Sequence, residues 1–156
     1  KFDYDIILDP KGDTLLYQLY SLVRLKGLFR KSNYNLEDIK NYKYELNNDC
    51  ITDAEKQLVE YDVEKQLVEY DVEKQLVLHL TCFDEVIKHC NKMLLPNHLC
   101  EYMYNLENKI NKFWRECKIL NCETELKKMK LCLSVKITME YCFQIINIPT
   151  DEINFL

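Results

Sequence analysis

The sequence contains very few residues that interrupt a helix, with only 2 glycines and 3 prolines among 156 residues. These two residue types supply most tight turns and mark the ends of strands, so their scarcity favours helices with short connections over a sheet. A content of 47% hydrophobic and 30% charged residues is ordinary for a globular domain with its own core. We therefore expect one all-α domain, a helical bundle that spans residues 1–156.

Long apolar runs and targeting sequences are also missing. No stretch approaches the roughly 20 apolar residues that a membrane-spanning helix needs, so we expect no membrane contact. The first residues, KFDYD, resemble neither a signal peptide nor a transit sequence. Because they lack an initial methionine and lead into sequence that looks ordered, they indicate a fragment of a longer protein.

Catalytic and metal-binding motifs are absent from the sequence. The eight cysteines form no CxxC pair and no zinc-ribbon spacing, and several lie among apolar helical residues, where a free thiol behaves as a small hydrophobe. A reduced intracellular protein is therefore favoured over a disulfide scaffold. The three histidines fall at unrelated helix positions, and no GxSxG, P-loop, GxGxxG or HExxH motif occurs. We expect no catalysis by this chain alone, and no bound metal ion or cofactor.

The stretch 96–119, PNHLCEYMYNLENKINKFWRECKI, carries the strongest helix signal. Its apolar residues recur with the 3.6-residue period of a helix that buries one face. Trp114 lies near the end of this helix, among several bases. One interpretation is a core helix with a solvated basic end; the other is an RNA-facing edge, because unstacked bases and phosphates suit a flat ring beside cations. The apolar residues are Leu99, Tyr102, Met103, Leu106, Ile110 and Phe113, and the bases are Lys109, Lys112, Arg115 and Lys118.

The net charge of −5 is unevenly distributed along the chain. Residues 53–77 hold eight acids and three lysines, a balance of −5, whereas residues 109–136 hold eight bases and three acids, a balance of +5. Affinity for phosphates follows a local basic surface rather than the total charge. RNA is therefore a plausible partner in spite of the acidic total.

Three further helices are predicted. Residues 14–31 form one, with Asp13 as N-cap and an apolar face, and its basic end (Arg24, Lys26, Arg30 and Lys31) contains no acid. Residues 82–94 form a short amphipathic helix, and residues 123–146 form an almost fully buried one. Lys127, Lys128 and Lys130 are expected on exposed turns at the start of the last helix. The expected apolar face of the first helix consists of Leu16, Leu19, Tyr20, Val23, Gly27 and Leu28.

A nonapeptide, EKQLVEYDV, occupies residues 55–63 and again 64–72, and EKQLV follows at 73–77. Thr52 and Glu55 form a capping-box signature, so one long helix is predicted to enter the repeat. This helix would carry two apolar stripes, one with Val72 and Leu76 and another with Tyr70 and Val77. Because nine residues advance a helix by about two and a half turns, removing one copy is predicted to invert the apolar face, and removing two to restore it.

Two parts of the sequence resemble one family. The segment 2–31 looks like the part of arginyl-tRNA synthetases that leads out of the catalytic domain. The stretches 73–87, 99–120 and 125–148 are similar to the helical DALR anticodon-binding domain of the same enzymes. The resemblance implies a bundle of the class I aminoacyl-tRNA synthetase anticodon-binding type, with residues 1–12 leading in from a missing catalytic domain and one helix extended by the repeat at 55–77. In the first segment the matching residues are Phe2, Asp3, Gly12, Thr14, Tyr17, Tyr20 and Arg24.

The resemblance also implies a set of residues that meet the anticodon loop of a tRNA. Trp114 stands where the family places an aromatic residue against this loop, and we expect Arg115 and Lys118 on neighbouring phosphates. Ser21 occupies a position, usually alanine, near the anticodon, with Tyr20 contributing mainly packing. At the C-terminus, Glu152, Ile153 and Asn154 take the place of residues that close over the loop.

The function implied is recognition of the anticodon loop of an arginine-accepting tRNA, within a ligase that joins arginine to that tRNA using ATP with Mg²⁺. The HIGH-like and KMSK-like signatures that hold ATP are absent here, so catalysis would belong to the missing domain. A cytoplasmic enzyme is expected, and an organellar one also fits the resemblance. The alternative is a helical protein-interaction module whose interface is the repeat helix.

Overall fold

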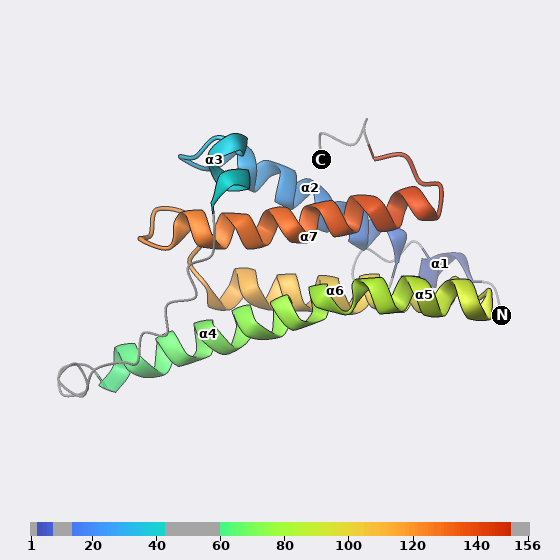
Figure 1. Cartoon of the computed structure of the whole chain (residues 1–156), viewed down its shortest axis with the longest axis horizontal. Coiled ribbons are helices and arrows are strands. Elements are labelled where there is room, and N and C mark those ends of the chain that lie inside the picture. Colours follow the sequence, from blue (N-terminus) through green and yellow to red (C-terminus); the bar gives the residue numbers. More distant parts are fainter. Residues whose placement is uncertain (1–2, 8–13, 43–59, 151–156) are drawn as a thin grey trace.

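The computed structural model describes residues 3–7, 14–42 and 60–150, and gives side chains on the repeat helix from Tyr70 onward. Within these residues the chain is helical and has no strand, so the all-α expectation is confirmed (Figure 1). The capping signature at Thr52 and Glu55 lies outside them. The helices are α1 (Tyr4–Ile7), α2 (Leu15–Lys31), α3 (Leu36–Asn41), α4 (Glu60–Thr81), α5 (Phe83–Met93), α6 (Asn97–Glu116) and α7 (Glu125–Ile145).

Helix α6 is the centre of the bundle, in contact with α2, α4, α5 and α7. All six apolar residues that define its predicted face are buried, because a stripe with a 3.6-residue period places them on one side of the helix. Figure 1 shows α4 and α5 following one another along one side of α6, while α7 and α2 lie on the other. The core is therefore built around the stretch with the strongest helix signal.

Helices α4 and α5 are separated by a single residue. Cys82 keeps a right-handed helical backbone (φ −77°, ψ −7°), and Val86 N–H donates to its carbonyl at 3.1 Å. The two helices therefore follow one another without a loop, with a bend where they meet (Figure 1).

The repeat helix α4 presents its two apolar stripes as predicted wherever side chains are described. Val72 and Leu76 are buried in the core, whereas Tyr70 and Val77 are exposed on the other side. One stripe thus packs against the bundle and the other faces solvent.

The predicted face of α2 is only partly correct, because Val23 is buried and Leu19 and Leu28 pack against the core, whereas two other members of that face do not. Its N-cap is Thr14, whose hydroxyl accepts a hydrogen bond from Tyr17 N–H. Leu16 and Tyr20 are exposed. Ser21 is buried and donates a hydrogen bond of 2.5 Å to the Glu107 carboxylate on α6, so the buried side of the helix is displaced from the predicted face. The residues that α2 buries are Gln18, Ser21, Leu22, Val23 and Leu25.

Helix α7 also departs from the prediction at two points. Lys128, expected on an exposed turn, is only 4% exposed, and its ammonium donates to the Lys118 carbonyl at 3.0 Å. Ile137, expected in the core, is exposed. The other buried residues of α7 include Met129, Cys132, Val135, Met139 and Phe143.

Candidate nucleic-acid interface

A groove of about 770 Å³ lies between α2 and the end of α6 with the segment that follows it. Among the residues described, its walls hold four bases, Arg24, Arg30, Lys31 and Lys118, and no acid. Such a surface attracts anions even though the whole chain is acidic. The other lining residues are Tyr20, Val23, Gly27, Leu28, Trp114, Cys117, Ile119 and Leu120.

Arg24 joins the two aromatic residues of the groove. Its guanidinium carbon lies 4.2 Å from the ring centroid of Trp114 and 5.9 Å from that of Tyr20, within the range of cation–π attraction. The guanidinium also donates to the Asn111 amide oxygen at 3.4 Å, and the Asn111 amide nitrogen donates to the Tyr17 hydroxyl at 3.0 Å. Trp114 is partly buried against the core. The result is a fixed platform of flat groups beside cationic ones.

Most bases in the second half of the chain contact the protein itself. Lys127 pairs with Glu73 at 2.7 Å and Lys136 with Glu140 at 2.9 Å, while Lys130 donates to the Lys40 carbonyl. The local charge of residues 109–136 therefore overstated the bases available to a ligand. The groove instead takes three of its four bases from α2.

The residues predicted for the site separate into two groups. Tyr20, which is 46% exposed, Trp114 and Lys118 come together in the groove. Ser21 is 1% exposed and points into the core toward Glu107, so the structure does not place it on the shared surface. Arg115 is outside the set of described lining residues and pairs with Glu116 at 2.9 Å. Asn154 lies beyond the residues that the structure describes.

Sequence reasoning missed Arg24, Arg30 and Lys31 as site residues. The available signal was the basic, acid-free end of the first helix, to which the sequence alone assigned no ligand. In the structure, this end borders Trp114 rather than open solvent.

The segment after α6 that forms part of the groove is held by Glu125. This carboxylate accepts hydrogen bonds from Asn121 N–H at 2.7 Å, the Ser32 hydroxyl at 2.9 Å and Asn33 N–H at 3.2 Å. Burial acts to raise the pKa of Glu125, but these bonds together hold it below its ordinary value of 4.5. The carboxylate is therefore ionised at neutral pH.

The pKa of Glu125 predicts a pH dependence of stability. A group whose pKa is lower in the folded state stabilises the protein above its unfolded-state pKa, and this contribution is lost as the pH falls through the folded-state value. We expect the melting temperature of wild type minus that of Glu125→Gln to be largest near neutral pH and to shrink below pH 4.5. Circular dichroism melts across pH would measure it. A constant difference, or an equal effect of Glu123→Gln at an exposed position of the same turn, would contradict this account.

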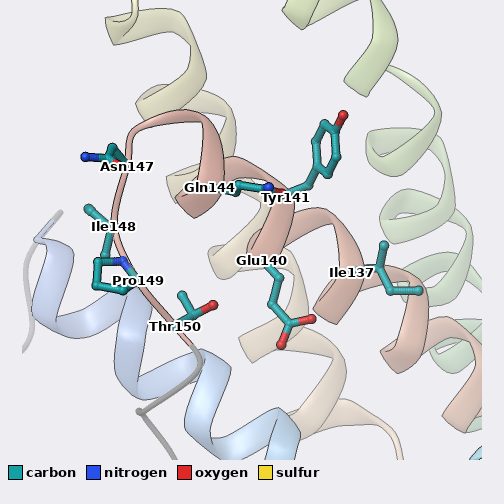
Figure 2. Close-up of a pocket in the computed structure, with 8 residues that line it drawn as sticks. All are labelled: Ile137, Glu140, Tyr141, Gln144, Asn147, Ile148, Pro149 and Thr150. Carbon is teal, nitrogen blue, oxygen red and sulfur yellow. The ribbon is translucent and has the colours of Figure 1, made fainter.

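Two other hollows contain none of the predicted site residues. One, of about 690 Å³, lies between the second half of α7 and residues 147–150; Figure 2 shows Glu140 and Tyr141 leaving α7 on different sides of it. The other brings His79, His89 and His98 together, although the sequence placed them at unrelated positions. Over the part of the chain that the structure covers, no three His, Cys, Asp or Glu side chains are arranged to hold a metal ion.

No helix in the described ranges is both long enough and apolar enough to cross a membrane. This concerns only residues 3–7, 14–42 and 60–150.

Comparison with known proteins finds arginine–tRNA ligases among the relatives of this chain. The chain is 30% identical over 148 residues to the cytoplasmic arginine–tRNA ligase of Arabidopsis thaliana, covering 94% of this chain and 21% of that protein. It is 34% identical over 132 residues to the arginine–tRNA ligase of Nostoc punctiforme, with coverage of 85% and 19%. The chloroplastic/mitochondrial enzyme of Arabidopsis thaliana is 29% identical over 148 residues, with coverage of 94% and 20%.

The chain thus spans about a fifth of the length of these relatives. The family model of the DALR anticodon binding domain matches residues 18–152, which include every helix from α3 to α7 and most of α2. By this match, and by the helical bundle it covers, the chain belongs to the DALR anticodon-binding domain family.

Proposed function

We propose that this chain recognises the anticodon loop of an arginine-accepting tRNA as one part of an arginine–tRNA ligase. The observation that carries the proposal is the groove, in which the Arg24 guanidinium lies over the rings of Trp114 and Tyr20 beside further bases with no described acid. The names of the relatives and the family match support the same class of ligand. Joining arginine to the tRNA with ATP and Mg²⁺ would belong to the remaining part of such a ligase.

Each part of the groove has a role in this proposal. An unpaired base stacks on the flat groups at Trp114 and Arg24, because every base has a π-face and both indole and guanidinium planes accept it. Phosphates on either side meet Lys118 on one wall, and Arg30 and Lys31 on the other. Arg115 would contact the loop from outside the groove, and the resemblance assigns Asn154 to the same loop.

The stacking role predicts a loss of affinity in Trp114→Ala. Removing the ring should weaken binding of an arginine tRNA anticodon stem-loop by about 1–3 kcal/mol, which is roughly 5- to 150-fold in Kd. Fluorescence anisotropy with labelled RNA would measure it, and circular dichroism would confirm that the variant is folded. The matched control is Tyr141→Ala, an exposed aromatic residue on α7 that does not line the groove.

The salt dependence of binding provides a second measure. Four bases on phosphates of a single-stranded loop should give a slope of log K against log salt of about −3. Equal affinities for wild type and a folded Trp114→Ala variant would overturn the stacking role, and a flat salt dependence would overturn the phosphate contacts.

A second candidate function is a protein interface on the outer stripe of α4. The exposed side chains of Tyr70 and Val77 favour it, because they lie on the side of the helix away from the core. An apolar interface of this kind would bind with little salt dependence, and Tyr70→Ser would weaken it without changing RNA affinity.

A further inference from the structure

Two charged residues on the first turn of α7 are buried. Glu125 is 2% exposed and Lys128 is 4% exposed. Burial of a charge costs free energy unless hydrogen bonds replace the lost water. Both residues make such bonds, and both bond to segments that belong to the groove or adjoin it.

Glu125 connects the ends of the two groove walls. Ser32 and Asn33 directly follow Lys31, the last residue of α2, and their donors reach the carboxylate at 2.9 and 3.2 Å. Asn121 directly follows Leu120 on the opposite wall, and its N–H donates at 2.7 Å. The Asn33 amide nitrogen donates both to Glu125 at 3.5 Å and to the Asn121 amide oxygen at 3.2 Å. Donors from Ser32, Asn33 and Asn121 thus all bond to the carboxylate, which acts as a shared acceptor.

Lys128 holds the same segment from one turn further along α7. Its ammonium donates to the carbonyl of Lys118, a groove residue, at 3.0 Å. Asn121 has a left-handed backbone (φ 54°), which asparagine tolerates better than most residues. The segment from 117 to 121 thus has a shape that α7 fixes at two points.

We infer that Glu125 is a positioning residue of the groove, which sets the separation of its two walls and so the exposure of Trp114. It touches no ligand itself. Its effect on the groove is a property of the protein alone, whereas its effect on RNA rests on the function proposed above.

The test uses Glu125→Gln, with Glu123→Gln as the matched control. Glutamine keeps the size of the side chain but replaces one of the two acceptor oxygens with an NH₂ group, which then faces donors. Trp114 is the single tryptophan of the chain, and its fluorescence therefore reports on the groove. We expect Glu125→Gln to shift Trp114 emission and to increase its quenching by acrylamide, while Glu123→Gln behaves as wild type.

RNA binding gives the second measurement. In Glu125→Gln the affinity should fall roughly tenfold, near the lower end of what a hydrogen bond to a charged group contributes. The salt slope should stay unchanged, because every base that meets a phosphate is still present. A residue that acted only on stability would lower the melting temperature without changing Trp114 quenching in the folded protein.

Asn33→Ala provides a second test in case the Glu125→Gln variant does not fold. Asn33 is exposed, and its removal takes away side-chain bonds to both Glu125 and Asn121, so a smaller change of Trp114 quenching is expected. Wild-type quenching in Asn33→Ala, together with wild-type quenching in any folded Glu125→Gln protein, would overturn the inference. If wild-type protein binds no RNA, the proposed function fails, and Trp114 quenching still decides the role of Glu125.

Discussion

Replacing Phe113 with alanine is expected to destabilise the domain by about 3–5 kcal/mol, the usual cost of removing a buried aromatic ring. Phe113 is completely buried at the centre of the bundle, and the total stability of such domains is only about 5–15 kcal/mol. Its neighbour Trp114 lies partly at the surface of the groove. We therefore expect Phe113 to act on stability and Trp114, by the function proposed above, to act on binding.

Urea unfolding followed by circular dichroism would measure both variants. Phe113→Ala should lower the midpoint strongly, while Trp114→Ala should lower it less and act mainly on RNA affinity. A larger loss of stability in Trp114→Ala than in Phe113→Ala would mean that the indole belongs to the core, and would remove the basis for treating it as a ligand contact.

Deleting one nonapeptide (residues 64–72) is expected to leave the stability almost unchanged, whereas deleting both (55–72) should cost about 2–4 kcal/mol, or roughly 5–15 °C in melting temperature. After the single deletion, the sequence EKQLVEYDV still precedes Glu73, so a valine still occupies the buried place of Val72. After the double deletion, Ala54 precedes Glu73 and the buried place loses two methyl groups. Leu76 would then also lie close to the start of the helix.

This order is the reverse of the one that helix phase predicts from the sequence alone. The phase argument requires a fixed element before the repeat, against which a half-turn would matter. In the structure, the buried residues Val72 and Leu76 lie at the end that joins α5, and that end is unchanged by deletion upstream. Thermal melts of the two deletion proteins would decide, and a single deletion that melts well below the double deletion would restore the phase argument.

Helix positions could be predicted closely because they depend on local patterns. Helices α5, α6 and α7 begin and end within a few residues of the predicted ranges, since apolar spacing and proline positions act over a few residues. The orientation of α2 could not be predicted in this way. Its buried side includes Ser21, which bonds to Glu107, 86 residues away in sequence, and a pattern that counts only apolar residues assigns serine to the surface.

The residues of the candidate site also divide into those that a local sequence pattern predicts and those that depend on contacts between distant residues. Trp114 and Lys118 lie on one continuous stretch of sequence. The combination of a flat ring with nearby bases predicted a nucleic-acid contact there. The number of bases available to a ligand was overestimated because Lys127 and Lys130 contact groups that are distant in sequence, Glu73 and the Lys40 carbonyl. Arg24 was missed for the converse reason, since its position over Trp114 results from packing between α2 and α6.

Because α4 contains a repeat, its length can change without a change in how the end next to α5 packs. Recombination between two identical stretches of a gene adds or removes whole copies, and each copy changes the helix by about 13.5 Å. The sequence of the packed end is the same after each gain or loss of a copy. The number of copies can therefore change without disturbing the bundle. The register is fixed where the repeat stops, at Leu78, His79 and Leu80. If the repeat continued, these positions would hold Glu, Tyr and Asp. Such side chains would fit the half-buried positions of His79 and Leu80 poorly. Natural variation in this gene should therefore come in units of nine codons, all of it on the far side of that boundary.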